Sequence, residues 1–229
     1  MSDHEHKLTA FPAFFKVAGK RVVIVGDGEE ALAKARLLGQ TNADIQIICE
    51  NPSIALENHA KSEGCELIFE TVSEAVLEGA VLVFAATGAQ AEDRKVVTLA
   101  RSLGIPANAV DQPDQCDFYT PAIVNRAPVA IAIGTEGAGP ILAQQIRAKI
   151  DRMLPVNLGR VARLAQSYRH AAEVLLEKGI SRRSFWKNFF TGSPSRHAEA
   201  GDLSQARRAA TRLLRAGGID HGHVSLVGA

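Results

Sequence analysis

Residues 20–35 read KRVVIVGDGEEALAKA, and this stretch decides the fold. Its run of β-branched residues stops at Gly26, and a helical pattern rich in Ala, Leu and Lys follows. A G-x-G-x-x-G/A sequence between a strand and a helix indicates dinucleotide binding. Gly26 allows a tight turn, Gly28 lets the backbone approach a pyrophosphate, and Ala31 is small enough for the helix to lie close to the strand. The positive end of the helix then holds the diphosphate. The residues predicted to contact the cofactor here are Gly26, Asp27, Gly28 and Glu29. The alternative is a tight strand-to-helix turn without a ligand.

Composition narrows the classes of protein that this chain of 229 residues can belong to. The length is enough for one large domain or two small ones with a buried core. The net charge of +1 gives no argument for nucleic acid or an anionic membrane as the main partner. No apolar run is long enough to cross a bilayer, and residues 1–16 lack the apolar core of a secretory signal. We therefore expect a cytoplasmic protein with no membrane or nucleic-acid partner.

Cysteine and histidine usage argues against a resident metal. Cys49, Cys65 and Cys116 are odd in number and lie in or beside strand-like stretches. They are predicted to be reduced, mostly buried thiols. No cysteine pair or histidine cluster has the spacing of a zinc site, so no metal ligand is predicted.

Strand-like and helix-like segments alternate between residues 21 and 110. Strands are predicted at 22–25, 45–49, 66–69, 81–86 and 105–110, with helices at 29–40, 54–63, 73–77 and 92–103. Short strands separated by helices predict a parallel sheet that is covered on both faces, a Rossmann-like α/β fold.

The pattern changes after Asp111. Residues 118–124 and 129–133 are predicted to form two strands joined by a turn, and a helix is predicted from Pro140 to residue 154. From residue 156 the chain is helical, with residues 192–195 as a turn-like linker. We interpret its many arginines as solvated helix faces rather than a nucleic-acid surface. Residues 223–229 read as one more strand, the first of a further domain.

Three further positions follow strands of the predicted sheet, at the edge where such sheets bind ligands. Glu50 and Asn51 end the second strand, where an acidic side chain meets the adenosine ribose, and the absence of a neighbouring Lys or Arg favours NAD over NADP. Ala86 and Thr87 end the fourth strand, and their small size admits a cofactor. Asp111 follows the fifth strand, where a carboxylate can act as a general base. The alternatives are that Glu50 and Asp111 only start turns and that Ala86 and Thr87 are ordinary loop residues.

Several motifs occur in one order and together resemble the precorrin-2 dehydrogenase/sirohydrochlorin ferrochelatase family, the N-terminal half of multifunctional siroheme synthase. The motifs are Gly26-Asp27-Gly28 with Ala31 and Lys34-Ala35-Arg36, then Ala85-Ala86-Thr87, Asn108-Ala109-Val110-Asp111, Phe118-Tyr119-Thr120-Pro121-Ala122 and Gly139-Pro140-Ile141-Leu142-Ala143. The match runs from about Phe11 to Leu158 and continues more loosely through residues 185–190. Residues 224–229 resemble the opening strand of the methyltransferase module of the fused enzymes.

The resemblance implies a domain plan and an activity. It implies an NAD-binding Rossmann domain (1–113), a dimerisation segment of two strands and a helix (114–154), a helical domain (155–220) and the start of a methyltransferase domain (221–229). It implies a homodimer that oxidises precorrin-2 to sirohydrochlorin with NAD and then inserts ferrous iron, which is a substrate, to give siroheme. Asp111 matches an aspartate implicated in both steps, and Asn108 joins the cofactor site. The substrate carries many carboxylates, so the substrate-binding residues predicted are Arg126, Thr135, Arg147 and Lys149.

The chain departs from the family pattern at several positions. Asp27 replaces a glycine, Gly88 stands where an acidic residue is common, and Glu136 adds a negative charge to the loop before Pro140. We expect Glu136 to repel an acidic tetrapyrrole. The departures at Asp27 and Glu136 motivate a rival hypothesis, an NAD-binding redox or nucleotide sensor without catalysis. A third possibility is a dimerisation and docking module.

Overall fold

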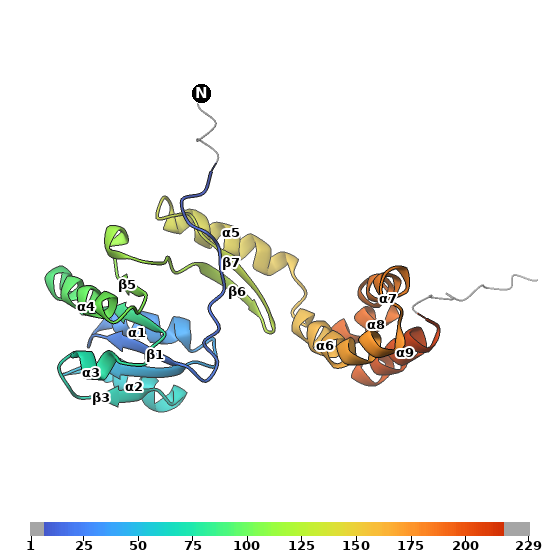
Figure 1. The fold of residues 1–229 in the computed structure, drawn as a ribbon, viewed down its shortest axis with the longest axis horizontal. Coiled ribbons are helices and arrows are strands. Elements are labelled where there is room, and N and C mark those ends of the chain that lie inside the picture. The colour runs from blue at the N-terminus through green and yellow to red at the C-terminus, as the bar shows by residue number, and fades with distance from the viewer. Residues whose placement is uncertain (1–6, 218–229) are drawn as a thin grey trace, which may run out of the picture. The chain divides into compact units, whose positions relative to one another are not determined.

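The computed structural model describes residues 7–217, which form two compact units (Figure 1). Within the described chain, unit 1 comprises residues 7–121 and 134–140, and unit 2 comprises residues 122–133 and 141–217. The predicted strand at 223–229 and the predicted domain start at 221–229 lie outside the described residues.

Unit 1 is built on a five-stranded parallel sheet in the order β3-β2-β1-β4-β5. The strands are β1 (Arg21–Val25), β2 (Asp44–Ile48), β3 (Glu66–Ile68), β4 (Leu82–Ala85) and β5 (Ala107–Ala109). The order reverses at β1, which pairs with both β2 and β4, so the carboxyl ends of β1 and β4 form the switch point where such sheets bind ligands. The predicted Rossmann-like fold is confirmed.

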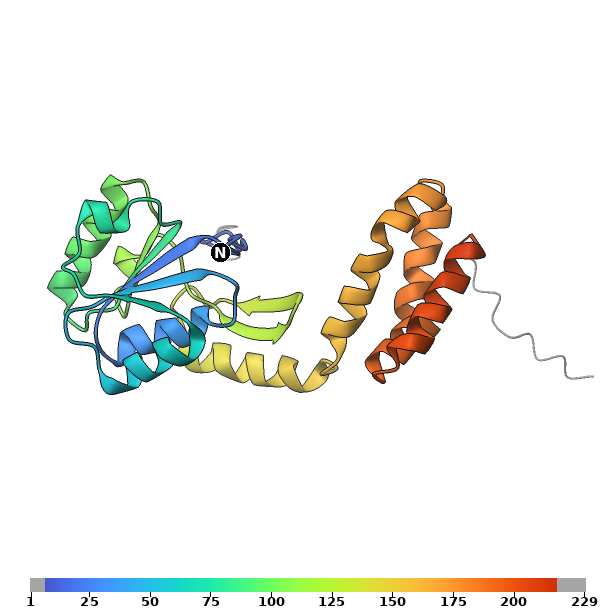
Figure 2. The same cartoon turned by 90° about the horizontal axis from the view of Figure 1, so that it is seen from below.

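Helices cover both faces of this sheet, as Figure 2 shows. They are α1 (Glu29–Leu38), α2 (Ile54–Glu63), α3 (Glu74–Leu77) and α4 (Gln90–Ser102). Val22 and Ile24 of β1 face the core formed with α1 and α2, whereas Val23 faces the core formed with α3 and α4. All three are fully buried. A strand that is buried on both faces needs a continuous apolar run, which is why residues 22–25 are all β-branched.

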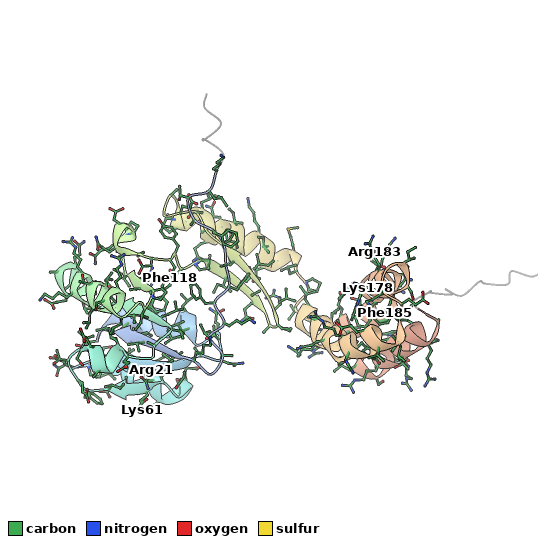
Figure 3. All side chains as sticks on the ribbon, viewed as in Figure 1. Arg21, Lys61, Phe118, Lys178, Arg183 and Phe185 are labelled. Carbon is green, nitrogen blue, oxygen red and sulfur yellow. The ribbon has the colours of Figure 1, made fainter. Side chains whose placement is uncertain are left out.

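The segment after β5 differs from the prediction. A short 3-10 helix, η2 (Pro113–Gln115), follows Asp111, and the strand predicted from residue 118 begins only at Ala122. Phe118 (labelled in Figure 3) is instead half-buried against the sheet, with its ring edge-on to Phe84 at a centroid distance of 5.4 Å. The large ring therefore covers the sheet as part of a loop.

Unit 2 contains a two-stranded antiparallel hairpin and five helices in the described chain. The elements are β6 (Ala122–Arg126), β7 (Val129–Ile133), α5 (Pro140–Met153), α6 (Leu158–Leu175), α7 (Ile180–Thr191), α8 (Ser193–Glu199) and α9 (Leu203–Arg215). α6 packs tightly on the hairpin turn, because a Cβ at Gly159 would lie 2.2 Å from the Ala127 carbonyl oxygen. Arg163 also donates to that oxygen at 2.6 Å. The segment predicted for dimerisation, residues 114–154, is divided between the two units, because residues 114–121 and 134–140 belong to unit 1.

The helices α6 to α9 share a core around Phe185 and Phe189, both fully buried. The linker predicted at residues 192–195 is wrong, since Ser193 begins α8 and Pro194 lies in its first turn. Proline is well tolerated there, because the first turn has no intrahelical partner for its missing N–H. Along residues 7–217, no helix is both long and apolar enough to cross a membrane.

Candidate functional site

The turn between β1 and α1 is shaped for a nucleotide. Gly26 has φ +151°, and a Cβ there would lie 1.9 Å from the Ala86 carbonyl oxygen, so only glycine fits. A Cβ at Gly28 would meet nothing within 4 Å, which leaves the space outside this turn open. Gly28 is also the N-cap of α1, and no side chain caps the N–H groups of the first turn. Free N–H groups and an open approach are the features that bind a pyrophosphate.

The Asp27 carboxylate makes a hydrogen bond to another part of the chain. Its Oδ1 accepts the N–H of Glu50 at 3.0 Å, and its carbonyl oxygen accepts the N–H of Ser53 at 2.9 Å. The side chain that departs from the family pattern therefore ties the first turn to the end of β2. The Glu50 side chain is exposed and accepts the Thr71 hydroxyl at 3.4 Å. Two carboxylates thus stand at the end of β2, where the ribose is predicted to bind, and Asn51 next to Glu50 is exposed.

Thr87 is turned inward rather than toward the ligand edge. Both its N–H, at 2.9 Å, and its hydroxyl, at 2.8 Å, donate to Oδ1 of Asp93. Asp93 is 2% exposed on α4, and its other oxygen accepts the Gln112 side-chain amide at 3.3 Å. The sequence analysis missed Asp93, because an acidic residue in a first helical turn is typical of a solvated helix start. Thr87, predicted to contact the cofactor, therefore has its N–H and hydroxyl committed to Asp93.

Asp111 stands in a strained backbone conformation at the end of β5. Its φ is +56°, in the left-handed region that few residues other than glycine adopt. Val110 before it is held by an N–H bond to Ala85 at 3.0 Å, and Gln112 after it is buried. The residue itself is exposed at the ligand edge. Strained residues that the surroundings hold in place concentrate at functional sites.

Asn108 and Cys116 brace the loop that carries Asp111. The Asn108 amide donates to the Phe118 carbonyl at 2.9 Å and to Cys116 Sγ at 3.2 Å, and Asn108 is only 5% exposed. The Cys116 thiol lies 3.2 Å from the Ala109 carbonyl oxygen and 3.3 Å from that of Gln112. Asn108, predicted to contact the cofactor, has its amide donors committed to this loop.

The cysteines of unit 1 are free thiols. Burial is the main cause that raises the pKa of each thiol above its usual value, to about 11 for Cys49. Cys49 is buried and Cys65 and Cys116 are half-buried, and their reduced state stays a prediction.

Lys34 is a second residue of the site that the sequence analysis did not single out by itself. Its Nζ lies 5.9 Å from the centroid of the Phe84 ring. Burial lowers the pKa of Lys34, while the nearby Cys116, Asp111 and Glu30 act to raise it. A cation therefore lies in the electrostatic neighbourhood of Asp111. The sequence signal that could have identified Lys34 is its position on the apolar face of α1, one residue before the buried Ala35.

Arg126 needs correction as a substrate ligand. Its Nη1 pairs with Asp151 Oδ1 at 2.9 Å, and Nη2 donates to the Asp151 carbonyl at 3.0 Å. Its Nε donates to Pro155 at 3.3 Å, and the side chain is only 16% exposed. Arg126 fastens the end of β6 to the end of α5, and four of its five N–H donors have partners within unit 2, which argues against the predicted role as a substrate ligand.

The other predicted substrate residues are divided between the units. Arg147, which donates to Gln144 at 3.0 Å, and the exposed Lys149 belong to unit 2, whereas Thr135 belongs to unit 1. Glu136, also in unit 1, does not project freely. Its Oε1 accepts the N–H groups of Thr9 at 2.7 Å and Ala10 at 2.9 Å.

Unit 1 therefore brings together the residues predicted for the cofactor and for catalysis at one edge of its sheet. In the described part of the chain, no group of three or more His, Cys, Asp or Glu side chains is placed to hold a metal ion.

Comparisons with known proteins match the two units of the chain to different family models. A family model described as "Putative NAD(P)-binding" matches residues 13–122, and one described as "Sirohaem synthase dimerisation region" matches residues 157–214. Siroheme synthase of Pseudomonas aeruginosa is 37% identical over 221 residues, covering 95% of this chain and 47% of that protein. Siroheme synthase of Azotobacter vinelandii is 35% identical over 219 residues, with the same coverage of each chain. The chain thus spans about half the length of the curated relatives it matches.

A solved structure titled "SirC, precorrin-2 dehydrogenase" shares the fold. It aligns with a TM-score of 0.75 at 17% identity and covers 90% of this chain and all of that one. At this identity the likeness bears on the fold alone.

Proposed function

Because the chain belongs to the precorrin-2 dehydrogenase/sirohydrochlorin ferrochelatase family, we propose that it oxidises precorrin-2 to sirohydrochlorin with NAD. The observation that supports this most strongly is the pairing of two features at one sheet edge. These are a glycine turn that no other residue can form, at Gly26, and a carboxylate held in a left-handed turn, at Asp111. A binding-only sensor has no need of the second.

The glycine turn and its neighbours fit the cofactor. The open space at Gly28 and the uncapped start of α1 accommodate the pyrophosphate, and Glu50 accepts hydrogen bonds from the ribose hydroxyls. When bound, NAD accepts a hydride from the tetrapyrrole. The chain's own residues orient the two reactants and exclude NADP, whose 2′-phosphate meets the carboxylates of Asp27 and Glu50.

Asp111 handles the proton. Oxidation of precorrin-2 removes a hydride and a proton, and the exposed Asp111 carboxylate accepts the proton as a general base. We also propose that the chain inserts ferrous iron, which displaces two pyrrole N–H protons, and that the exposed Asp111 accepts these protons one at a time and passes each to solvent. Iron is a substrate in this step.

Assembly and setting complete the proposal. The match of residues 157–214 to a dimerisation region supports a homodimer, and we propose that it works in the cytoplasm. We also propose that residues 114–154 contribute to the dimer and that Arg147, Lys149 and Thr135 bind substrate carboxylates. We also propose that the chain is fused to a methyltransferase domain, and the greater length of the relatives is consistent with a longer protein.

The test is turnover under anaerobic conditions with precorrin-2 and NAD, followed by the absorbance of sirohydrochlorin and of NADH. We expect the two products in equal amounts, and siroheme once ferrous iron is added. Asp111→Ala should abolish both steps and leave NAD affinity unchanged. Asp114→Ala, which removes an exposed carboxylate three residues away, is the matched control. NAD binding without turnover would instead favour the sensor hypothesis.

A further inference from the structure

Asp93 is the one buried carboxylate in the described chain. It accepts three hydrogen bonds: two from Thr87, at 2.9 and 2.8 Å, and one from the Gln112 amide at 3.3 Å. A buried carboxylate is costly unless it is hydrogen-bonded, so the surrounding residues must supply these donors together. Neither Thr87 nor Gln112 is on the same element as Asp93, so the carboxylate joins two separate loops through α4.

The donor directions in this network are set by Arg94. The guanidinium of Arg94 can only donate, and its Nε donates to Gln112 Oε1 at 3.3 Å. The amide of Gln112 must therefore present its NH2 group to residue 93, which must accept. A carboxylate satisfies this requirement. An asparagine that keeps its oxygen toward Thr87 would turn its NH2 group toward the NH2 group of Gln112. In the opposite orientation it would lose the hydrogen bonds from Thr87.

The two loops that Asp93 joins are those that form the site. The Thr87 loop supports the nucleotide turn, because a Cβ at Gly26 would lie 1.9 Å from the Ala86 oxygen and 3.1 Å from the Thr87 nitrogen. Gln112 follows Asp111 directly, so anchoring its side chain holds the left-handed turn from behind. One buried carboxylate thus contacts the supports of both the cofactor turn and the catalytic turn.

We propose that Asp93 is a positioning residue that sets the cofactor turn and the Asp111 turn relative to each other. This inference rests on the proposed function for its catalytic half, while its cofactor half concerns nucleotide binding alone. Displacement of a reacting group by about 1 Å costs on the order of a hundredfold in rate. We therefore expect Asp93→Asn to weaken NAD binding about tenfold and to lower kcat about tenfold to hundredfold.

The decisive experiment exchanges the two chemical groups. Gln112→Glu alone places two carboxylates together and should be at least as harmful as Asp93→Asn. In the double variant, the new amide at position 93 accepts from Thr87 and donates to the new carboxylate at position 112, which also accepts from Arg94. The swap again pairs every donor with an acceptor and keeps the charge. We therefore expect NAD affinity and kcat within about threefold of those of the unmodified chain. The effects of the two single variants would then be far from additive, which is a large coupling energy between positions 93 and 112.

Asp117→Asn is the matched control. Asp117 also accepts from a backbone N–H, that of Ala107 at 2.9 Å, and from a side chain, Arg101, at 3.0 Å. Its bonds hold the amino end of β5, away from the ligand edge. We expect this variant to lower the melting temperature and leave the Kd for NAD and kcat unchanged.

NAD affinity is measured by titration calorimetry, and kcat by sirohydrochlorin formation well below the melting temperature of every variant. The proposal is overturned if the swap is no better than the worse single variant, or if Asp117→Asn weakens NAD binding equally. If the unmodified chain binds NAD without oxidising precorrin-2, the proposed function fails, and the NAD affinities of the four Asp93 and Gln112 combinations still decide the inference.

Discussion

Replacing Asp111 by glycine should abolish catalysis without destabilising the protein, which separates the two roles of this position. The residue has φ +56°, and the left-handed conformation costs residues with a Cβ about 1–2 kcal/mol. Aspartate tolerates it better than alanine, because its short polar side chain can bond locally. Glycine removes the cost but widens the unfolded ensemble by about 0.5–1 kcal/mol.

The expected magnitudes follow from these opposing effects. Asp111→Gly should change the free energy of unfolding by less than about 1 kcal/mol, since the relieved strain and the added chain entropy nearly cancel. Asp111→Ala keeps the strain and loses the polar side chain, so it should be less stable than the glycine variant by about 1 kcal/mol. That difference corresponds to about 2–4 °C in melting temperature for a protein of this size.

The assay combines thermal unfolding with turnover. Both variants should bind NAD and neither should form sirohydrochlorin, while Asp114→Gly, a change of the same kind in η2, should remain active. Turnover by Asp111→Gly would refute the role of the carboxylate as the base. Equal stability of the glycine and alanine variants would refute the left-handed turn in solution.

Three further predictions concern the edges of the site. Glu50→Gln should raise affinity for NADP while changing affinity for NAD little, and calorimetry with both nucleotides would expose an equal change in each. Gly26→Ala should abolish NAD binding and destabilise unit 1 by about 1–3 kcal/mol, because its Cβ overlaps the Ala86 oxygen; an unchanged melting temperature would contradict the tight turn. Hydrogen bonds from the Ala10 N–H and from Thr9 lower the pKa of Glu136 below its usual 4.5. The lowered pKa means that the ionised carboxylate is stabilised by these hydrogen bonds, and this stabilisation is fully present above pH 4.5. It is lost as the pH falls through the lowered pKa. The amide NMR signals of residues 9 and 10 should therefore shift only in that acidic range. Glu136→Gln should shift the same signals at neutral pH, and tighter sirohydrochlorin binding by this variant would show that the charge also reaches the substrate.

Local signals explain why much of unit 1 could be predicted from the sequence. The helix predicted over residues 54–63 is found with the same bounds. Ser53 caps its start by accepting the Leu56 N–H at 3.2 Å, and Gly64 ends it with φ +72°. Both signals lie within a few residues of the helix, so no tertiary information is needed. The β-branched run of β1 is predictable for the same reason.

The departures at Phe118, Arg126 and Asp93 come from contacts that are remote in sequence. Phe118 belongs to a strand-like run, but its ring packs on Phe84 and its carbonyl accepts from Asn108, which holds the segment as a loop. Arg126 looks free to bind a carboxylate until the fold places Asp151 beside it, 25 positions away. Asp93 has the sequence signature of a solvated helix start, and only the packing of the β5 loop against α4 buries it beside Gln112, 19 positions away.

The net charge of +1 hides how charge is distributed along the chain, because it is the sum over two units of opposite net charge. The described residues of unit 1 carry 10 Lys and Arg against 17 Asp and Glu, whereas those of unit 2 carry 16 against 5. We therefore expect the proposed tetrapyrrole substrate, which carries many carboxylates, to be repelled by unit 1 and attracted by unit 2. Within unit 1, the half-buried Lys34 offers a cation in the electrostatic neighbourhood of Asp111, and a charge interacts more strongly where the dielectric is lower than in water. Long-range attraction to unit 2 should weaken with salt, whereas a contact with Lys34 should persist, because screening acts mainly on exposed charges.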